Sequence, residues 1–524
     1  MKPVIPFLFA ASLFAFPAIA AANDTTQEDK PRVTTPSDAI PTSAPKAEKR
    51  PHTYTHHGIT VEDPYDWLYD KSYPTIDDED VLDYVKAENA WFEAQMGERE
   101  AVTEALFQEM RARIKEDDST VPQRRGDYLY WSEFDEGEQY RKHYRKPVGA
   151  AKDAQGTLIL DENALAGDLE YFRLGAVAIS KNGRYMAYST DTNGSERYTA
   201  VIKDLDTGEL LADEIPNLRG GLTWVANDSA LIYTPSTEEW RSLEIKLHTI
   251  GEPLESDVSL FLEEDQSFSV GAGLSAQEDW LIIATGDNET SEVRFVSADN
   301  PTGALTLIKP RQKGVEYSVD IREGELWVWT NDDHINFRLA KASLDTPGDW
   351  ETVIGGADDF YLTGFDLFKD FFVIEGREKG LDQIELRYYD DLERTTPIAF
   401  PEASYSAGLS NNPEYDQTVL RLSYESMVTP DSVYDYDVAS GALQLLKQQE
   451  IPSGYDKSLY MTERLEIEAR DGTMVPVSVV MRKDRKQLLE AQGIEGAGPL
   501  HLYAYGAYGY AIPPVFSTTR LSLV

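Results

Sequence analysis

The sequence predicts a mainly β protein whose largest part is a seven-bladed β-propeller, a ring of seven four-stranded sheets. Three observations carry this prediction. Short aromatic and β-branched runs recur at blade-length spacing, two amphipathic helical patterns precede them, and a different strand pattern follows them. The 524 residues are 41% hydrophobic and 11% aromatic, which is enough apolar material for a large folded core.

The N-terminal 50 residues are expected to contribute a targeting segment and a leader. Lys2 precedes an apolar stretch over residues 4–18, and small residues at 18–22 offer a cleavage site, so residues 1–22 are predicted to be a signal peptide. This predicts a periplasmic or secreted protein, and an uncleaved segment that tethers the chain to a membrane is the alternative. Residues 23–50 are rich in Thr, Ser, Pro, Asp and Lys, which predicts a disordered leader.

Residues 51–118 are predicted to form a helical segment that precedes all of the β structure. Apolar residues recur there at three- and four-residue steps, as in amphipathic helices, and residues 77–80 place negative charge on the first turn of the first helix. The apolar positions are Leu82, Val85, Phe92 and Met96 in the first helix and Val102, Leu106, Met110 and Ile114 in the second.

Residues 119–456 are predicted to form the propeller. The central residues of six apolar runs are Ala187, Ile232, Ile283, Val328, Val373 and Leu420. The gaps between them are 45, 51, 45, 45 and 47 residues, the length of one propeller blade, and an earlier run at residues 128–132 supplies a seventh unit. A pair of β-sandwiches is the alternative, but sandwiches rarely keep one period over so many repeats.

Residues 457–524 show a new pattern. Two alternating stretches at 464–469 and 474–481 are joined through Asp471-Gly472, which predicts a hairpin. A buried strand is expected at residues 500–504, running into the glycine-containing motif YGAYG at 505–509. Glycines let the backbone turn sharply where a strand ends, and α/β enzymes place oxyanion donors there, although a purely structural tight turn would also explain them.

The charge and the residue types exclude several functions. Lys and Arg number 49 against 92 Asp and Glu, a net charge of −43, so nucleic acid is not expected as a partner. Basic peptides fit this charge better, although solubility is the simpler explanation. The chain has no cysteine, and its seven histidines form no metal-binding pattern, so we predict no metal site and no cofactor.

The sequence resembles the prolyl oligopeptidase family from about residue 52 to residue 524, and within that family it is most similar to the oligopeptidase B (protease II) branch. The family motifs are residues 57–68 (HGITVEDPYDWL), 84–89 (YVKAEN), 470–472 (RDG) with 475–478 (VPVS), and 503–509 (YAYGAYG) followed by Ser517 and 520–523 (RLSL). The branch is indicated by Asn336-Phe337 and by residues 446–448 (LKQ) before Ile451-Pro452.

The resemblance implies a fold and an activity. It implies a propeller that acts as a size filter over an α/β-hydrolase domain, to which residues 51–118 and 457–524 would contribute the N-terminal helical segment and the opening strands. The activity implied is that of a Ser-Asp-His serine endopeptidase acting on short peptides, basic ones included. By position, Tyr505 corresponds to the family's oxyanion-stabilising tyrosine, and Tyr508 to an aromatic residue that lines the S1 region and binds substrate.

The sequence departs from the family pattern in two ways. No G-x-S-x-G motif is present, and the family's triad lies beyond the position of Val524, so we expect a truncated hydrolase domain, no hydrolysis by this chain alone, and a separately encoded hydrolase fragment as a partner. Where the oligopeptidase B branch has an acidic pair, this chain has Pro513, Pro514 and Val515, which leaves the preference for basic residues open.

Two other functions remain open from the sequence. The first is a propeller that binds peptides without catalysis. The second is a propeller enzyme with its chemistry inside the ring, although no cluster of His and carboxylate residues recurs at matching blade positions.

Overall fold

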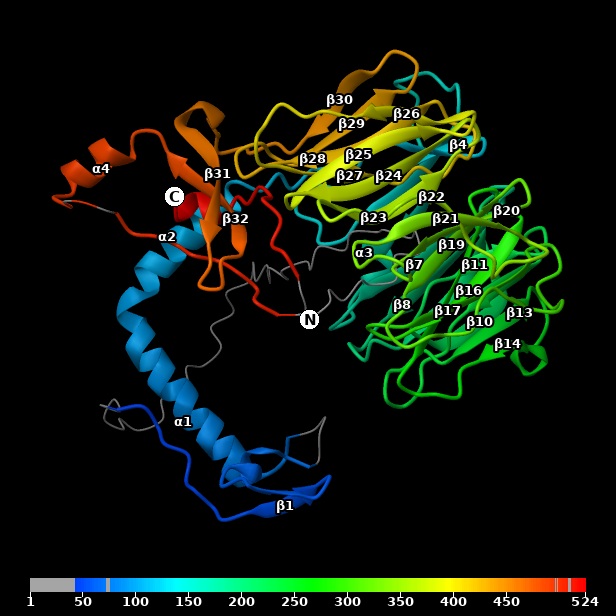
Figure 1. The fold of residues 1–524 in the computed structure, drawn as a ribbon. Helices are drawn as coiled ribbons and strands as arrows, with labels where there is room; N and C mark the ends of the chain where they lie inside the picture. Colours follow the sequence, from blue (N-terminus) through cyan, green and yellow to red (C-terminus); the bar gives the residue numbers. More distant parts are fainter. Residues whose placement is uncertain (1–42, 72–75, 495, 497, 508–509) are drawn as a thin grey trace. The chain divides into compact units, whose positions relative to one another are not determined.

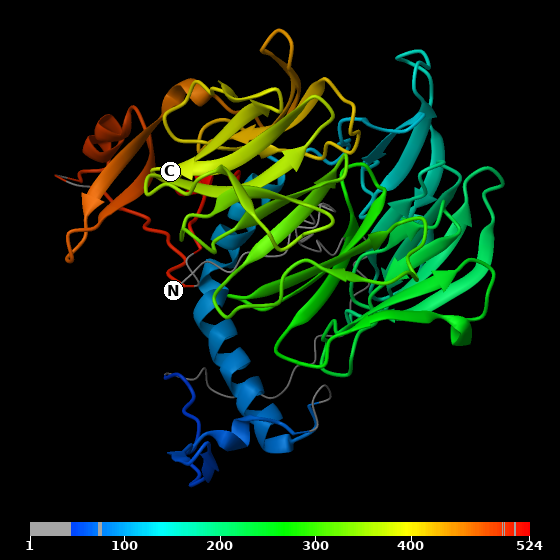
Figure 2. The same ribbon diagram turned by 45° about the vertical axis from the view of Figure 1, so that its right-hand side comes forward.

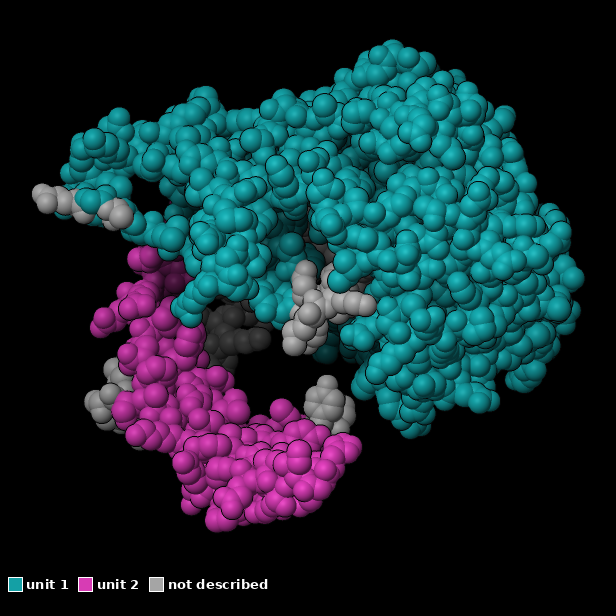
Figure 3. Space-filling model, in the orientation of Figure 1, with its two compact units in different colours: residues 1–18, 114–524 teal, residues 19–113 magenta. Residues whose placement is uncertain are grey.

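The structure is a computed structural model that describes residues 43–71, 76–494, 496, 498–507 and 510–524 (Figure 1). The predicted signal peptide, most of the predicted leader and Tyr508 lie outside the described residues. The chain divides into two compact units, whose described parts are residues 43–113 and 114–524 (Figure 3).

The smaller unit begins with a β-hairpin that the sequence did not predict. Strands β1 (Thr53–His56) and β2 (Ile59–Glu62) pair antiparallel around His57 and Gly58. Both turn residues have positive φ, 52° and 76°, as two-residue hairpin turns require. Helices are therefore not the first elements of the fold, and two four-residue strands are too short for their alternation to stand out in the sequence.

The predicted helices follow this hairpin. After the short turn η1 (Asp66–Leu68), α1 spans Glu79–Met96, and η2 (Gly97–Arg99) joins it to α2 (Glu100–Arg111). The Asp78 side chain caps α1 by accepting from the N–H groups of Asp80 and Val81. The acidic first turn expected from the sequence therefore begins α1, and both helical predictions are confirmed.

The larger unit contains seven four-stranded antiparallel sheets, each built from four consecutive strands (Figures 1 and 2). This arrangement is a seven-bladed β-propeller, as predicted. Blade 1 contains β3 (Gln123–Arg125), β4 (Tyr128–Glu133), β5 (Lys142–Pro147) and β6 (Thr157–Asp161), and blade 2 contains β7 (Arg173–Ile179), β8 (Tyr185–Asp191), β9 (Tyr198–Asp204) and β10 (Leu210–Leu218). Blade 3 contains β11 (Thr223–Val225), β12 (Ala230–Tyr233), β13 (Glu244–Thr249) and β14 (Val258–Leu262), and blade 4 contains β15 (Ser269–Leu274), β16 (Trp280–Gly286), β17 (Ser291–Ser297) and β18 (Thr306–Leu307).

Blades 5 to 7 complete the ring, and short helices interrupt it at two places. Helix α3 (Glu162–Ala166) follows blade 1, and the turn η3 (Leu254–Ser256) lies in blade 3. Blade 5 contains β19 (Tyr317–Arg322), β20 (Glu325–Thr330), β21 (Arg338–Ser343) and β22 (Glu351–Ile354). Blade 6 contains β23 (Phe360–Leu367), β24 (Phe371–Glu378), β25 (Leu381–Tyr388) and β26 (Asp391–Pro397). Blade 7 contains β27 (Ser406–Leu409), β28 (Val419–Glu425), β29 (Ser432–Asp437) and β30 (Ala442–Gln448).

The repeat found in the sequence corresponds to the second strand of every blade. Its six central residues lie in β8, β12, β16, β20, β24 and β28, and the earlier run lies in β4. These strands carry the most deeply buried side chains, such as Met186, Leu281 and Phe372, because each is covered on both faces by neighbouring blades. The first strands β7, β11 and β15 of consecutive blades contact one another, whereas fourth strands such as β26 are exposed, so the first strand of each blade is the innermost.

Blades 1 and 7 close the ring through side chains, since neither blade shares a strand with the other. Lys447 pairs with Asp118 at 2.7 Å, and the N–H of Gly126 donates to Glu414 at 2.7 Å. Arg421 donates to the carbonyl oxygen of Pro122 at 3.4 Å. The seam between the two ends of the propeller chain is therefore polar, while the other blade interfaces in the described structure are apolar clusters.

After blade 7 the chain forms a long hairpin and a few short elements. The turn η4 (Lys457–Leu459) leads into β31 (Tyr460–Glu468) and β32 (Met474–Arg482), which pair antiparallel as the sequence predicted. Helix α4 (Arg485–Ala491) and the turn η5 (Arg520–Ser522) follow.

The strand expected at residues 500–504 is wrong. That segment has no regular structure, and Leu500 and Leu502 are 81% and 78% exposed. A strand needs a paired neighbour to satisfy its backbone groups, and among the described residues the sheet of β31 and β32 contains only these two strands. The apolar residues at 500–504 are therefore exposed rather than buried.

Candidate functional site

The topology of the blades defines two ends of the propeller. Because the four strands of each blade alternate in direction, the second-to-third strand loops lie at the end where the chain enters β3 and leaves β30. The β24–β25 turn and the β28–β29 loop belong to this entry–exit end. Segments that follow blade 7 therefore start beside these two loops, and the candidate site is the junction where they meet.

The linker between β30 and β31 is anchored on blade 7. Lys457 Nζ donates to Glu402 Oε1 at 2.8 Å, and Ser426 Oγ donates to Glu402 Oε2 at 2.6 Å. Burial of Glu402 opposes its ionisation, but the bonds from Lys457, Ser426 and Thr429 outweigh burial and hold its pKa below the ordinary value. The Tyr455 hydroxyl donates to the carbonyl oxygen of Val428 at 2.7 Å.

The β31–β32 hairpin is also tied to the propeller by polar contacts. Ser478 Oγ lies 2.8 Å from Ser404 Oγ, and Arg464 donates to Ser478 Oγ at 3.4 Å and to the carbonyl oxygen of Lys379 in the β24–β25 turn. Ser478 belongs to one of the family motifs. Its partners are a second hydroxyl and a cation, neither of which can take its proton.

The last described segment, residues 510–524, reaches blade 7 through Phe516. Its N–H donates to Glu425 Oε2 at 2.9 Å, and its ring, 8% exposed as a residue, packs edge-on against Tyr455 with the ring centres 5.2 Å apart. Burial, reinforced by Asp431, raises the pKa of Glu425 to about 7, although the Phe516 N–H and Arg520 act in the opposite direction.

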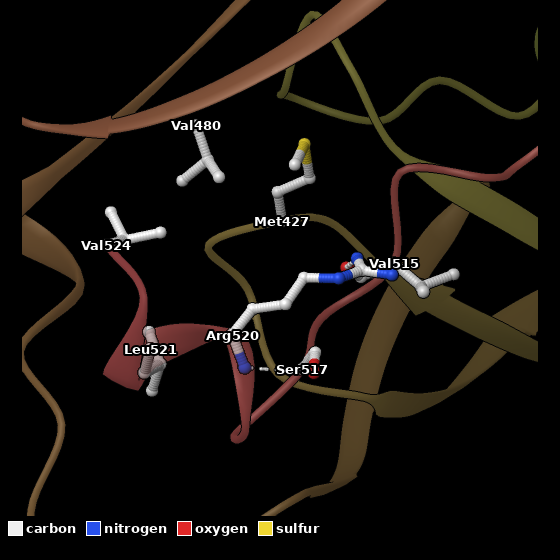
Figure 4. Close-up of a pocket in the computed structure, with 7 residues that line it drawn as sticks. All are labelled: Met427, Val480, Val515, Ser517, Arg520, Leu521 and Val524. Carbon is white, nitrogen blue, oxygen red and sulfur yellow. Dashed lines mark hydrogen bonds between the residues drawn. The ribbon is translucent and has the colours of Figure 1, made fainter. Parts of the chain in front are cut away.

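A small pocket lies where these segments meet (Figure 4). Met427 comes from the β28–β29 loop, Val480 from β32, and the other lining residues come from the last segment. They are Val515, Ser517, Arg520, Leu521 and Val524. The Ser517 hydroxyl lies 2.9 Å from the Thr519 hydroxyl and accepts the N–H of Arg520 at 3.3 Å, so it belongs to a local turn.

Tyr505, the predicted oxyanion donor, lies in the irregular segment and is 53% exposed. Gly506 after it has a φ of 76°, a backbone conformation that favours glycine. The Tyr505 ring packs edge-on against Tyr510 at 5.6 Å. The role of Tyr505 in oxyanion stabilisation stays a prediction, and Tyr508 lies outside the described residues.

The histidines of the described structure are not arranged as catalytic bases. His143, His248 and His334 pair with carboxylates, and none of the described histidines is hydrogen bonded to a serine or threonine hydroxyl. His248 is the most buried, with Asp257 and Asp213 at 2.8 Å and 2.9 Å from its two ring nitrogens. These bonds join blade 2 to blade 3 and have a structural role.

The described residues contain neither a metal cluster nor a membrane-spanning helix. No group of three or more His, Asp or Glu side chains is placed to hold a metal ion in the part of the chain that the structure describes. Within that same part, no helix combines the length and the apolar character that a membrane crossing demands.

Three carboxylates on inner strands of the propeller were not predicted from the sequence to be functional residues. Asp320 in β19, Asp366 in β23 and Glu375 in β24 are half-buried, and burial raises their pKa values to about 7, 6 and 8. Glu375 accepts the N–H of Leu409 in blade 7 at 2.7 Å, and Asp320 accepts the N–H of Ala276 in blade 4 at 2.9 Å. An acidic residue beside large apolar residues in a predicted strand, as Glu375 follows FFVI at 371–374, is the signal that could have found them.

The comparisons with known proteins agree with the geometry. Residues 45–449 match the family model described as prolyl oligopeptidase, N-terminal beta-propeller domain. The chain is 36% identical to dipeptidyl aminopeptidase BI of Pseudoxanthomonas mexicana, over 100% of this chain and 71% of that protein. It is 30% identical to protease 2 of Moraxella lacunata, over 92% of this chain and 68% of that protein. The chain therefore belongs to the prolyl oligopeptidase family.

Solved structures give the same result. Oligopeptidase B from Trypanosoma brucei, in a closed form with covalently bound antipain, superposes with a TM-score of 0.83 at 29% identity, over 92% of this chain and 70% of that one. Oligopeptidase B from Leishmania major gives a TM-score of 0.84 at 25% identity, with the same coverage. This chain thus comprises the propeller of a prolyl oligopeptidase family peptidase and covers only part of its homologues.

Proposed function

We propose that this chain is the propeller-bearing part of a serine peptidase that hydrolyses short peptides. The observation that carries the proposal is the complete set of seven blades followed by the β31–β32 hairpin, in a chain 36% identical to dipeptidyl aminopeptidase BI. The propeller would act as a size filter, and residues 457–524 would be the opening part of an α/β-hydrolase domain. Export to the periplasm or secretion is part of the proposal and is supported by the signal-peptide pattern of residues 1–22.

In this proposal the nucleophile, acid and histidine come from hydrolase residues outside this 524-residue chain. The support is the lack of a G-x-S-x-G motif in the sequence and, among the described residues, the lack of a histidine hydrogen bonded to a serine or threonine hydroxyl. Tyr505 would donate its phenol hydrogen to the oxyanion of the tetrahedral intermediate. Tyr508 would line the S1 region.

The test is to join this chain to the part of dipeptidyl aminopeptidase BI that it does not match and to assay peptide turnover. We expect no turnover by the 524-residue chain and measurable turnover by the joined chain. Two substrate sets separate the modes that the relatives' names suggest. One set reports release of an N-terminal dipeptide, and the other consists of N-terminally blocked peptides that report internal cleavage. A well-folded joined chain without turnover of either set would contradict the proposal.

The second candidate is a propeller that binds peptides without catalysis. The observation that favours it is that the 524-residue sequence contains no G-x-S-x-G motif. It predicts measurable binding of short peptides by the 524-residue chain and no turnover after the hydrolase part is added.

A further inference from the structure

We propose that Glu425 is a positioning residue whose protonation controls how firmly residues 515–524, the C-terminal part of the last segment, are docked on blade 7. The proposal goes beyond the proposed function and does not depend on it. It concerns a contact between two parts of the larger unit that the peptidase mechanism does not use.

The geometry places Glu425 between the propeller and the last segment. It is the final residue of β28, at the entry–exit end, and its Oε2 accepts the N–H of Phe516 at 2.9 Å. Phe516 is buried against Tyr455, and Tyr455 is fixed to Val428 of the same blade. Glu425 is half-buried, and docking of the segment beside it removes part of its hydration, so its ionisation must respond to docking.

The charged groups around Glu425 act in both directions. Asp431 from the β28–β29 loop repels its negative charge, and Arg520 from η5 attracts it. Burial raises the pKa of Asp431 as well; Lys447 of the same blade acts against this shift, and Asp118 adds to it. Burial is the largest effect, and the pKa of Glu425 in the docked state is raised to about 7.

The sign of the pH dependence follows from linkage. When the segment leaves, Glu425 regains water and its pKa falls toward the ordinary value near 4.5. Between these two values the docked state holds a proton that the undocked state has lost. Docking is therefore strongest in acid and weakens as pH rises through about 7, while the protonated carboxyl group can still accept the Phe516 N–H through its carbonyl oxygen.

Docking of this segment also restrains the loop before it. The Arg520 guanidinium lies 5.7 Å from the ring centre of Tyr503, two residues before Tyr505. If the proposed function holds, Glu425 would thus couple protonation to the placement of the oxyanion donor. This last consequence alone rests on the proposed function.

Hydrogen exchange measured by mass spectrometry on the 524-residue chain tests the proposal without any catalysis. After correction for the intrinsic pH dependence of exchange, we expect amides of residues 515–524 to be about tenfold better protected at pH 5.5 than at pH 8. Glu425→Gln keeps an acceptor but cannot ionise, so we expect strong protection at both pH values. Glu425→Leu has no acceptor, and we expect the Phe516 amide to be poorly protected at both.

Asp416→Asn is the matched control, because Asp416 is an exposed carboxylate of the same blade in the β27–β28 loop, at the opposite end. We expect it to keep the wild-type difference. Equal wild-type protection at the two pH values would overturn the proposal, and so would a Glu425→Gln variant that retains the wild-type difference. Since no substrate is involved, this failure is distinct from failure of the proposed function.

Discussion

At the scale of single residues, Glu402 shows how one carboxylate fixes the exit from the propeller. Its two oxygens accept from Ser426, Thr429 and Lys457, so a single side chain joins blade 7 to the linker that leads into β31. Sequence alone could not identify it, because Glu402 and Lys457 are separated by 54 intervening positions and neither lies in a recognisable motif. Tertiary polar contacts of this kind have no local pattern.

Replacing Glu402 with alanine should lower the free energy of unfolding by about 2 kcal/mol, because two buried hydroxyl donors lose their acceptor. The measurement is urea-induced unfolding followed by intrinsic fluorescence. Glu393→Ala, which removes an exposed carboxylate on β26, is the control and should change stability by less than about 0.5 kcal/mol. Equal effects of the two substitutions would show that the Glu402 contacts contribute nothing specific.

Tyr505 carries the residue-scale prediction for catalysis. In the chain joined to a hydrolase part, Tyr505→Phe should reduce kcat by roughly 10²–10³, the usual cost of removing one oxyanion donor. Its KM should change little, since the donor acts on the transition state. Steady-state kinetics on one peptide substrate measures both constants, and an unimpaired kcat would show that the role assigned by resemblance is wrong.

At the scale of elements, the inner strands of blades 5 and 6 make stability depend on pH. In the folded protein burial raises the pKa of Glu375 to about 8 and that of Asp320 to about 7, well above their values in an unfolded chain. The folded state therefore retains protons that the unfolded chain releases above about pH 4.5. The contribution of Glu375 and Asp320 to the free energy of unfolding is therefore present below about pH 4.5 and is lost as the pH rises toward 8.

Glu375→Gln should remove part of the loss of stability that occurs as the pH rises toward 8. The amide oxygen can still accept the Leu409 N–H, so the variant should be about 2 kcal/mol more stable than wild type at pH 8 and similar to it near pH 4.5. Urea unfolding at several pH values gives the comparison. Glu378→Gln, an exposed carboxylate in the same strand β24, should leave the profile unchanged. A Glu375→Gln variant that is no more stable at pH 8 would contradict the assignment.

The propeller could be predicted from the sequence, whereas the β1–β2 hairpin and the contacts of the C-terminal segment could not. The propeller was predictable because second strands such as β16, β20 and β24 are buried on both faces and carry apolar runs that recur at a fixed spacing. The β1–β2 hairpin was missed because its strands are short and exposed. The strand expected at residues 500–504 has apolar residues but no neighbouring strand to pair with. The Glu425–Phe516 contact depends on packing between distant segments and has no sequence signal.

At the scale of the larger unit, the described C-terminal elements leave apolar side chains in water. Leu465 and Ile467 in β31, with Leu500, Leu502 and Tyr503 beyond it, are 41% to 81% exposed. We expect the purified chain to associate or to bind a hydrophobic dye, because several large apolar side chains exposed in neighbouring parts of the sequence favour association. Light scattering and dye fluorescence measure this, and a monodisperse monomer that binds no dye would contradict it.

This chain comprises the propeller of a prolyl oligopeptidase family peptidase, and we propose that the nucleophile lies in hydrolase residues outside it. The most direct measurement is the intact mass of the protein after treatment with a serine-directed fluorophosphonate. If the nucleophile lies outside this chain, the 524-residue chain should carry no adduct. The joined chain should carry one adduct per molecule, located in the added hydrolase part. An adduct on the 524-residue chain itself would contradict this proposal.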